Sequence, residues 1–469
     1  MKRIVTGTAV LLLIAAFGLA ATLQRGSVKP TSSTSSSESP STSTVATTSP
    51  IDVGETLPTV TTEITYRPYG CGANTRGQVG VPTEGQSVLQ PIPIEAPEPK
   101  KIASGLLHSL MIDTEGHLYS WGDNTFGQCG HQDTGVVVEP RLVQGLEDRT
   151  FIAIGAGWFH SLAVDSEGWV WTFGNNSSGQ LGNGRLGPWR APTPARINMM
   201  ADAVSVAGGM AHSMALTSQG ILFVWGNNFF RQVNSDGTMD LVSFLQTQAG
   251  RLPESVPSNP QELWAWLESF LMDLADDAKK LVALEPQSIF RDVRAIAAGA
   301  THSLAVLSDK TVAAWGSNLA GECGDGRFLV FASGFVQVKA LMGLSIDTLT
   351  EAESVAGGMF HSMVLREEGT VYGFGYNQEG QLGLGIATPP SPIGVKVPGL
   401  KEVDSISLSY GHTVACLRDG TAQAWGLNSH GELGLGYTAP FIATPTTILG
   451  ISQVARAAAG GSHTLFVAP

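Results

Sequence analysis

The chain repeats two short phrases seven times, and this repetition constrains its fold more than any other property of the sequence. The first phrase is a glycine, two variable residues, a histidine and a serine or threonine, followed by alternating apolar residues; Ser409 once replaces the glycine. Successive histidines of this phrase lie 52, 52, 90, 59, 51 and 51 residues apart. They are His108, His160, His212, His302, His361, His412 and His463.

The second phrase is an aromatic residue, Gly, any residue, Asn, two variable residues, Gly, Gln or Glu, any residue and Gly. Five copies follow the pattern, at residues 121–130, 173–182, 315–324, 374–383 and 425–434. A sixth copy, at 71–80, has Cys71 in the aromatic position, and a seventh, at 225–234, has Arg231 and Asn234 in place of two glycines. Seven copies of each phrase predict seven structural units.

Each unit is expected to contain a β-hairpin. In one unit, residues 161–164 alternate in polarity, residues 165–168 form a turn that ends on Gly168, and residues 169–173 form the return strand. The glycine supplies the positive φ that such a turn requires. A hairpin this short cannot bury both faces alone, so the units must stack around an axis or along a line.

The two ends of the repeat region decide between these arrangements. The first half-unit, 71–80, has no histidine phrase before it, and the last histidine phrase, 460–467, has no second phrase after it. Joined, they make one complete unit, so the N- and C-terminal strands share a blade and the ring has no free edge at the seam. The sequence therefore predicts an all-β fold, a seven-bladed β-propeller over residues 66–469.

The 90-residue interval predicts a helical insertion at about 235–288. Asn259 caps a helix that Pro260 begins, and apolar residues then recur at helical spacing. This stripe either packs on the propeller, which we favour, or docks a partner, in which case Trp264 and Trp266 are candidate contacts. A smaller excursion at 328–336 leaves the same alternatives open.

The phrases resemble the repeats of the regulator of chromosome condensation family, whose members are seven-bladed propellers with units of about this length. The resemblance covers residues 66–469 apart from the insertion, and the departures at Cys71, Arg231 and Ser409 concern local geometry. It implies a role such as nucleotide exchange on a small GTPase with chromatin binding, as in the namesake, or inhibition, as in the propeller-type β-lactamase inhibitors. The chain lacks the Gly-Trp-Arg-His-Thr repeats of the similar plant ultraviolet-B photoreceptor.

The recurring histidines do not predict an active site. A catalytic centre needs one place where nucleophile, base and orienting group meet, whereas these residues lie in seven separate blades. They are better explained as buried groups that hydrogen-bond the strands together. The four cysteines fit no zinc pattern and are too few for a disulfide-stapled fold. We therefore expect a protein that is not an enzyme, with no cofactor and no metal ion.

The two residues before each histidine differ from unit to unit, so the fold does not dictate them. If they lie on one face, their side chains form a rim with the composition of a protein-binding hot spot. The alternative, which we weigh somewhat higher, is packing between blades that any apolar side chain could provide. The candidate rim residues are Trp158, Phe159, Met210, Met359, Phe360 and Tyr410.

The N-terminal region predicts export. Lys2 and Arg3 precede an apolar stretch at 4–23, so residues 1–25 form either a cleaved signal peptide or an uncleaved membrane anchor. Residues 26–65 form a linker, in which 15 of the 20 residues from 31 to 50 are Ser or Thr. We expect an extracytoplasmic protein, secreted or anchored to the membrane by residues 4–23.

The net charge of the chain limits the classes of partner that it can bind. The chain has 27 basic and 40 acidic residues, a net charge of −13, and this opposes nucleic acid as a partner. We expect a monomeric, non-catalytic propeller that recognises another protein or a cell-surface component, in its sharper form a secreted inhibitor. The alternative is a guanine-nucleotide exchange factor for a small GTPase with chromatin association, which the acidic charge and the predicted leader oppose.

Overall fold

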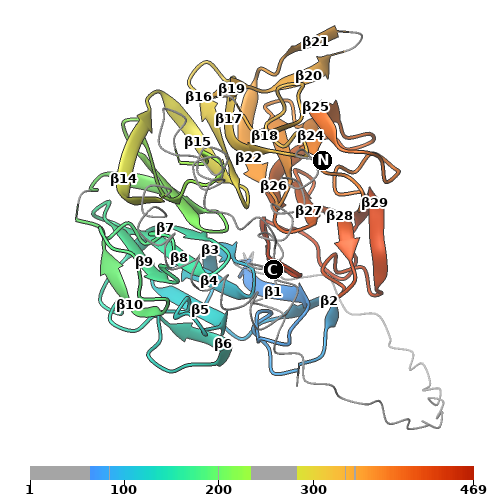
Figure 1. Ribbon diagram of the computed structural model, residues 1–469. Helices are drawn as coiled ribbons and strands as arrows, with labels where there is room; N and C mark the ends of the chain where they lie inside the picture. Colours follow the sequence, from blue (N-terminus) through green and yellow to red (C-terminus); the bar gives the residue numbers. More distant parts are fainter. Residues whose placement is uncertain (1–63, 84, 199, 234–281, 333, 343–344) are drawn as a thin grey trace, which may run out of the picture. The chain divides into compact units, whose positions relative to one another are not determined.

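The computed structural model describes residues 64–83, 85–198, 200–233, 282–332, 334–342 and 345–469. Within these ranges the chain forms strands and no helix. The strands make seven sheets that follow one another around a ring (Figure 1). The seven-bladed, all-β propeller predicted from the repeats is therefore confirmed.

Blades one to three are antiparallel four-stranded sheets. Blade one comprises β3 (Pro99–Ser104), β4 (His108–Asp113), β5 (Leu118–Asp123) and β6 (Val136–Leu142). Blade two comprises β7 (Phe151–Ala156), β8 (His160–Asp165), β9 (Val170–Gly174) and β10 (Ala191–Arg196). Blade three comprises β11 (Ala203–Gly208), β12 (His212–Thr217), β13 (Leu222–Asn227) and β14 (Val282–Phe290).

Blades four to six follow the same plan, and blades four and five carry additional strands at the outer edge. Blade four comprises β15 (Val293–Ala298), β16 (His302–Leu307), β17 (Val312–Asn318), β18 (Leu329–Phe331) and β19 (Val336–Gln337). Blade five comprises β22 (Ala352–Gly357), β23 (His361–Arg366), β24 (Val371–Gly375) and β25 (Ser391–Lys396), extended by β20 (Lys339–Met342) and β21 (Ser345–Thr348). Blade six comprises β26 (Val403–Leu408), β27 (His412–Leu417), β28 (Ala422–Asn428) and β29 (Ala439–Thr447).

Blade seven is built from both ends of the propeller, as predicted. Its strand order is β2 (Val88–Pro93), β1 (Arg67–Gly72), β31 (His463–Ala468) and β30 (Arg456–Ala459). β1 and β31 pair antiparallel along their whole length, from Arg67 opposite Ala468 to Gly72 opposite His463. Each end of the propeller thus supplies the hydrogen-bonding partners that the other lacks.

The prediction of a helical insertion at 235–288 is wrong for its last residues. Residues 282–288 belong to β14, which pairs with β13 as the outer strand of blade three. A three-stranded blade would leave the edge of β13 unpaired, so the chain returns as a strand. The rest of the predicted insertion, including Trp264 and Trp266, lies outside the described residues. The excursion at 328–336 contains β18 and the start of β19, and both pair with β17.

The predicted leader and linker also fall largely outside the described residues, which begin at residue 64. Within the described ranges, no helix has the length and apolar character needed to cross a membrane.

The first strand of each blade lies nearest the axis, because these strands pack against one another from blade to blade. Apolar side chains fill the spaces between the sheets, and Trp121, Trp225, Trp315 and Trp425 are fully buried there. The hairpin turns have the predicted geometry, with Gly168 at a φ of 83°. The result is a rigid support whose turns project at the two faces.

Candidate functional site

The repeated histidines form a closed ring of hydrogen bonds between blades. The Nε2 atom of each histidine lies 2.8 to 3.4 Å from the hydroxyl oxygen of the serine or threonine in the next blade. The seven pairs are His108–Ser161, His160–Ser213, His212–Ser303, His302–Ser362, His361–Thr413, His412–Thr464 and His463–Ser109. The hydrogen-bonding role predicted for these residues is confirmed.

The tautomer of the histidines follows from the next bond in each chain of contacts. The Ser213 hydroxyl donates to the main-chain oxygen of Gln180 at 2.8 Å, and the other six hydroxyls do the same to the equivalent Gln or Glu. A hydroxyl has one proton to donate, so it must accept from the histidine, whose Nε2 therefore carries the hydrogen. Burial lowers the pKa of six of these histidines to about 3 and that of His412 to about 4.

These properties assign the ring to structure and not to chemistry. All seven histidines are fully buried, neutral and engaged with the next blade. The four cysteines are likewise buried free thiols. Within the described ranges, no group of three or more His, Cys, Asp or Glu side chains is placed to hold a metal ion.

The longest hydrogen bond of the histidine ring reaches Thr413 in blade six, where Ser409 replaces the usual glycine. The His361 to Thr413 contact measures 3.4 Å, against 2.8 to 3.0 Å for the other six. The main-chain bond from Ser409 to His412 also measures 3.4 Å, whereas the equivalent bond of Gly157 to His160 measures 2.9 Å. The departure at this position therefore changes local geometry and leaves the fold intact.

One face of the propeller carries the turns that precede these histidines. His108 pairs with Gly122 across the β4–β5 ladder, so the histidine turns and the Asn-x-x-Gly turns lie at the same end of each blade. We call this end the mouth face. The ends of the inner strands enclose a cavity of about 50 Å³ there, and Trp158 and Met359 contribute to its lining.

Four aromatic side chains form a continuous cluster on the mouth face, which we call the mouth cluster: Phe126, Trp158, Phe159 and Tyr410. The Phe126 and Phe159 ring centroids lie 5.1 Å apart, and those of Phe159 and Trp158 lie 6.5 Å apart. The Trp158 ring lies 6.3 Å from that of Tyr410. Because Trp158 belongs to blade two and Tyr410 to blade six, this last contact spans the mouth of the ring.

The structure thus brings together three of the six predicted rim residues, Trp158, Phe159 and Tyr410. The other three occupy equivalent turns and are half-buried: Met210, Met359 and Phe360. The Met210 nitrogen donates to the Ala300 oxygen at 3.0 Å, and that of Met359 donates to the Ser409 oxygen at 3.0 Å. Main-chain bonds between blades therefore fix these turns whatever side chains they carry.

Sequence reasoning missed three residues of this face, Phe126, Tyr376 and Glu379. All three occupy variable positions of the second phrase, either beside its Asn or just before its second Gly. The comparison among units that selected the residue pairs before the histidines would have selected these positions too. The signal was present in the repeats and required only the knowledge that both turns share a face.

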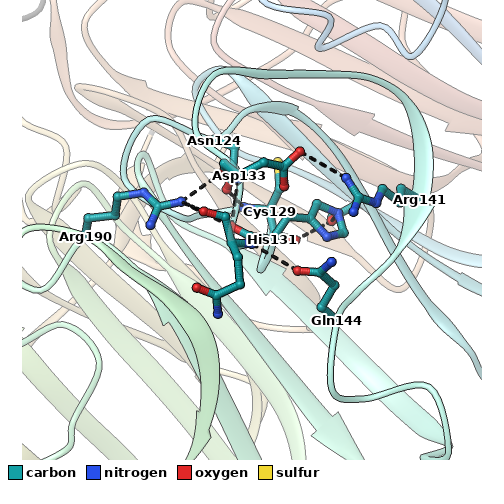
Figure 2. Close-up of polar contacts among 9 residues, drawn as sticks. Asn124, Cys129, His131, Asp133, Arg141, Gln144 and Arg190 are labelled. Carbon is teal, nitrogen blue, oxygen red and sulfur yellow. Dashed lines mark hydrogen bonds and ion pairs between the residues drawn. The ribbon is translucent and has the colours of Figure 1, made fainter.

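The loop that carries Phe126 is held firmly at its outer end (Figure 2). The Asn124 side chain donates to the main-chain oxygens of His131 and Asp133, at 3.0 and 2.6 Å. Arg190 of blade two donates to the His131, Gln132 and Asp133 oxygens at 2.7 to 3.3 Å. This clamp fixes the loop of blade one to blade two and so supports the Phe126 to Phe159 contact.

Comparison with known families agrees with this architecture. Two models of the regulator of chromosome condensation (RCC1) repeat match the chain, one at residues 115–164, 167–216, 368–416 and 419–467. The other matches residues 100–128, 151–180, 203–232, 293–322, 353–381 and 403–432. Together the matches cover more than half of the chain.

Several proteins share the repeats at moderate identity. The chain is 31% identical over 415 residues to the mouse E3 ubiquitin-protein ligase HERC2. This match covers 85% of the present chain but only 7% of the ligase. It is 26% identical over 351 residues to the Arabidopsis thaliana ultraviolet-B receptor UVR8, covering 71% of this chain and 78% of the receptor. It is 35% identical over 220 residues to human protein RCC2, covering 46% of this chain and 39% of RCC2.

A solved structure shows the same fold. Prp20p from Saccharomyces cerevisiae, described with its binding properties to Gsp1p and histones, superposes with a TM-score of 0.69 at 21% identity. The match covers 86% of this chain and 92% of that one. On the family matches and this shared architecture, the chain belongs to the regulator of chromosome condensation repeat family.

Proposed function

We propose that this chain is a non-catalytic, protein-binding regulator that recognises its partner with the mouth face. The observation that carries the proposal is the mouth cluster, an aromatic surface assembled from three blades at positions where the repeats do not agree. Aromatic side chains on turns held by main-chain bonds provide large contact areas at small entropic cost, which is typical of binding hot spots. The relatives described above support a regulator more than they support a secreted inhibitor.

Within that role, nucleotide exchange on a small GTPase is the specific activity that the comparisons favour. Prp20p is described with its binding to Gsp1p and histones. An exchange factor needs no catalytic side-chain constellation of its own, because it acts by binding the GTPase. This fits a mouth face whose repeated polar groups are all committed to structure.

The first experiment measures release of a labelled guanine nucleotide from a panel of small GTPases, with the full chain added. The variant Trp158→Ala/Phe159→Ala is expected to keep the fold and lose both GTPase binding and exchange. The matched control is Leu449→Ala, which removes an apolar side chain that is 68% exposed beyond the opposite end of β29. Unfolding of the double variant would instead support a packing role for these residues.

Export is a separate proposal that rests on residues 1–65. A reporter fused after Gly54 tests it directly. Reporter activity outside the cytoplasm would support an extracytoplasmic partner, and activity confined to the cytoplasm would favour the GTPase. Fractionation of the same fusion would distinguish a cleaved leader from an anchor at residues 4–23.

A further inference from the structure

The mouth face is built differently in two sectors that the repeat makes equivalent. Between blades one and two, the three equivalent positions carry Phe126, Trp158 and Phe159. Between blades five and six, the same positions carry Glu379, Tyr410 and Gly411. A carboxylate thus replaces one phenylalanine, and a glycine replaces the other.

The missing side chain at Gly411 lets the main chain approach the Glu379 carboxylate closely. A β-carbon built on Gly411 would lie 3.3 Å from Glu379 Oε2 and 3.4 Å from the Leu427 β-carbon. At the equivalent position, Phe159 carries a ring that contacts the ring of Phe126. The Glu379 carboxylate therefore lies directly against the turn that carries Tyr410 and Gly411. We call the surface formed by Glu379, Gly411, Tyr376, Tyr410 and Trp158 the socket.

Two tyrosines belong to the turns that meet at this carboxylate. Tyr410 adjoins Gly411 and contacts the Trp158 ring at 6.3 Å. Tyr376 immediately precedes the Asn-x-x-Gly turn that carries Glu379. Burial raises the pKa of Tyr376, and the Glu379 charge and Tyr410 raise it further. The Tyr376 hydroxyl donates to Gln378 Oε1 at 2.8 Å, so it is not committed to the carboxylate.

Glu379 has no cationic partner within the described part of the chain. Its Oε2 accepts one long bond from Gln381 Nε2, at 3.3 Å, and none of the ion pairs found there includes it. Partial burial raises the pKa of this carboxyl above its usual value. A half-buried carboxylate with spare acceptor capacity is an unfavourable arrangement that a cation would relieve.

The protein covers aromatic rings with its own arginines elsewhere. Arg149 lies 4.5 Å from the Trp171 ring centroid, and Arg196 lies 4.4 Å from that of Trp169. The four such contacts among the described residues include neither Trp158 nor Tyr410. Tyr410 is 38% exposed, so its ring is accessible to a cation from outside the chain.

We propose that the socket formed by Glu379, Gly411, Tyr376, Tyr410 and Trp158 receives a lysine or arginine side chain of the protein partner. The carboxylate pairs with the positive charge, and the ring faces attract it through their π electrons. The net charge of −13 adds a field that favours a basic segment. This inference rests on the proposed use of the mouth face for protein binding and adds the chemistry of the residue recognised.

The test uses small probes, so it does not require the partner. Nα-acetyl-arginine amide, Nα-acetyl-lysine amide and the uncharged Nα-acetyl-norleucine amide are titrated into the full chain, with binding followed by NMR of the ligand. We expect at least one cationic amide to bind and the norleucine amide to bind at least about tenfold more weakly. Equal binding of all three probes would overturn the proposal.

Variants separate the socket from general acidity. Glu379→Gln keeps the shape and the acceptor for Gln381 and is expected to weaken cation binding about tenfold or more. The matched control, Glu353→Gln, removes the charge of an exposed glutamate near the other end of β22 and is expected to change nothing. Tyr410→Phe retains the ring and should bind, whereas Tyr410→Leu should not. Unchanged binding by Glu379→Gln would contradict the socket.

Failure of this inference is distinguishable from failure of the proposed function. If Trp158→Ala/Phe159→Ala abolishes GTPase binding while Glu379→Gln leaves both probes and GTPase unaffected, the mouth face binds protein and the socket is wrong. If the cationic amides bind through Glu379 but the double variant binds its GTPase normally, the socket stands and the proposed partner surface is wrong.

Discussion

The buried histidine ring and the mouth turns lie next to each other in the chain and obey opposite rules. Each histidine makes the same contact in every blade, whereas the two residues immediately before it change from Trp158 and Phe159 in one unit to Tyr410 and Gly411 in another. The ring must satisfy buried polar atoms, and this leaves one solution. The turns are fixed by main-chain bonds, so their side chains are free to serve another purpose.

Low pH is expected to have the largest effect on the histidine ring. The folded chain keeps these histidines neutral down to about pH 3, because burial lowers the pKa of six of them to about 3, whereas the unfolded chain protonates them near 6.5. Between these values the unfolded state binds more protons, so the free energy of unfolding falls as pH falls. Seven such groups give a slope on the order of 10 kcal/mol per pH unit.

A propeller with a usual stability of about 5–15 kcal/mol therefore unfolds cooperatively between about pH 4 and 6. Tryptophan fluorescence followed from pH 7 to pH 3 is the measurement. The mouth cluster should lose its native signal together with the core, since the turns depend on the ring. A native spectrum at pH 3.5 would contradict the assignment of these histidines as neutral.

A single hydroxyl deletion breaks one link of the ring. Ser213→Ala leaves His160 Nε2 and the Gln180 oxygen without the bonds of 2.8 Å that each makes to this hydroxyl, and should lower the free energy of unfolding by about 2–3 kcal/mol. Thr413→Val at the long 3.4 Å contact should cost about 1 kcal/mol. Urea denaturation of both variants measures the two losses in free energy of unfolding. Equal losses would show that the length of a hydrogen bond in the ring does not determine how much it stabilises the fold.

Substitutions in the mouth cluster should affect partner binding more than stability, in contrast to substitutions in the histidine ring. Trp158→Ala removes ring contacts to Phe159 and Tyr410, and is expected to lower the free energy of unfolding by about 1–2 kcal/mol while weakening partner binding tenfold or more. Urea denaturation and the exchange assay are run on the same preparation. A loss of more than about 4 kcal/mol would place Trp158 with the core residues.

The smallest expected effect lies at the outer edge. Trp189 is 72% exposed and precedes the clamp residue Arg190. Trp189→Ala should leave the free energy of unfolding within about 0.5 kcal/mol of the original. Arg190→Ala offers the contrast, because it removes the donor to three main-chain oxygens, and it should loosen the Phe126 loop in hydrogen exchange.

The features of the fold that depend on the number and spacing of the repeats could be predicted from the sequence. The seven blades, the seam and the hydrogen-bonding role of the histidines all follow from spacing and from the two incomplete end units. The predicted insertion wrongly includes residues 282–288, because the 90-residue interval gives the length of the extra segment but not the residue at which β14 begins. The Trp158 to Tyr410 contact could not be predicted, since it joins blades that are not neighbours and depends on the width of the ring.

The seam also determines when the propeller can close during synthesis of the chain. Tyr69 on β1 hydrogen-bonds to Pro469, 400 residues later in the chain, at 2.8 Å. At about 5–20 residues per second, β1 waits roughly 20–80 seconds on the ribosome before its partner exists. During that interval its exposed edge can accept a strand from another nascent chain. A cell that makes this protein must therefore protect the edge of β1 until β31 has been synthesised.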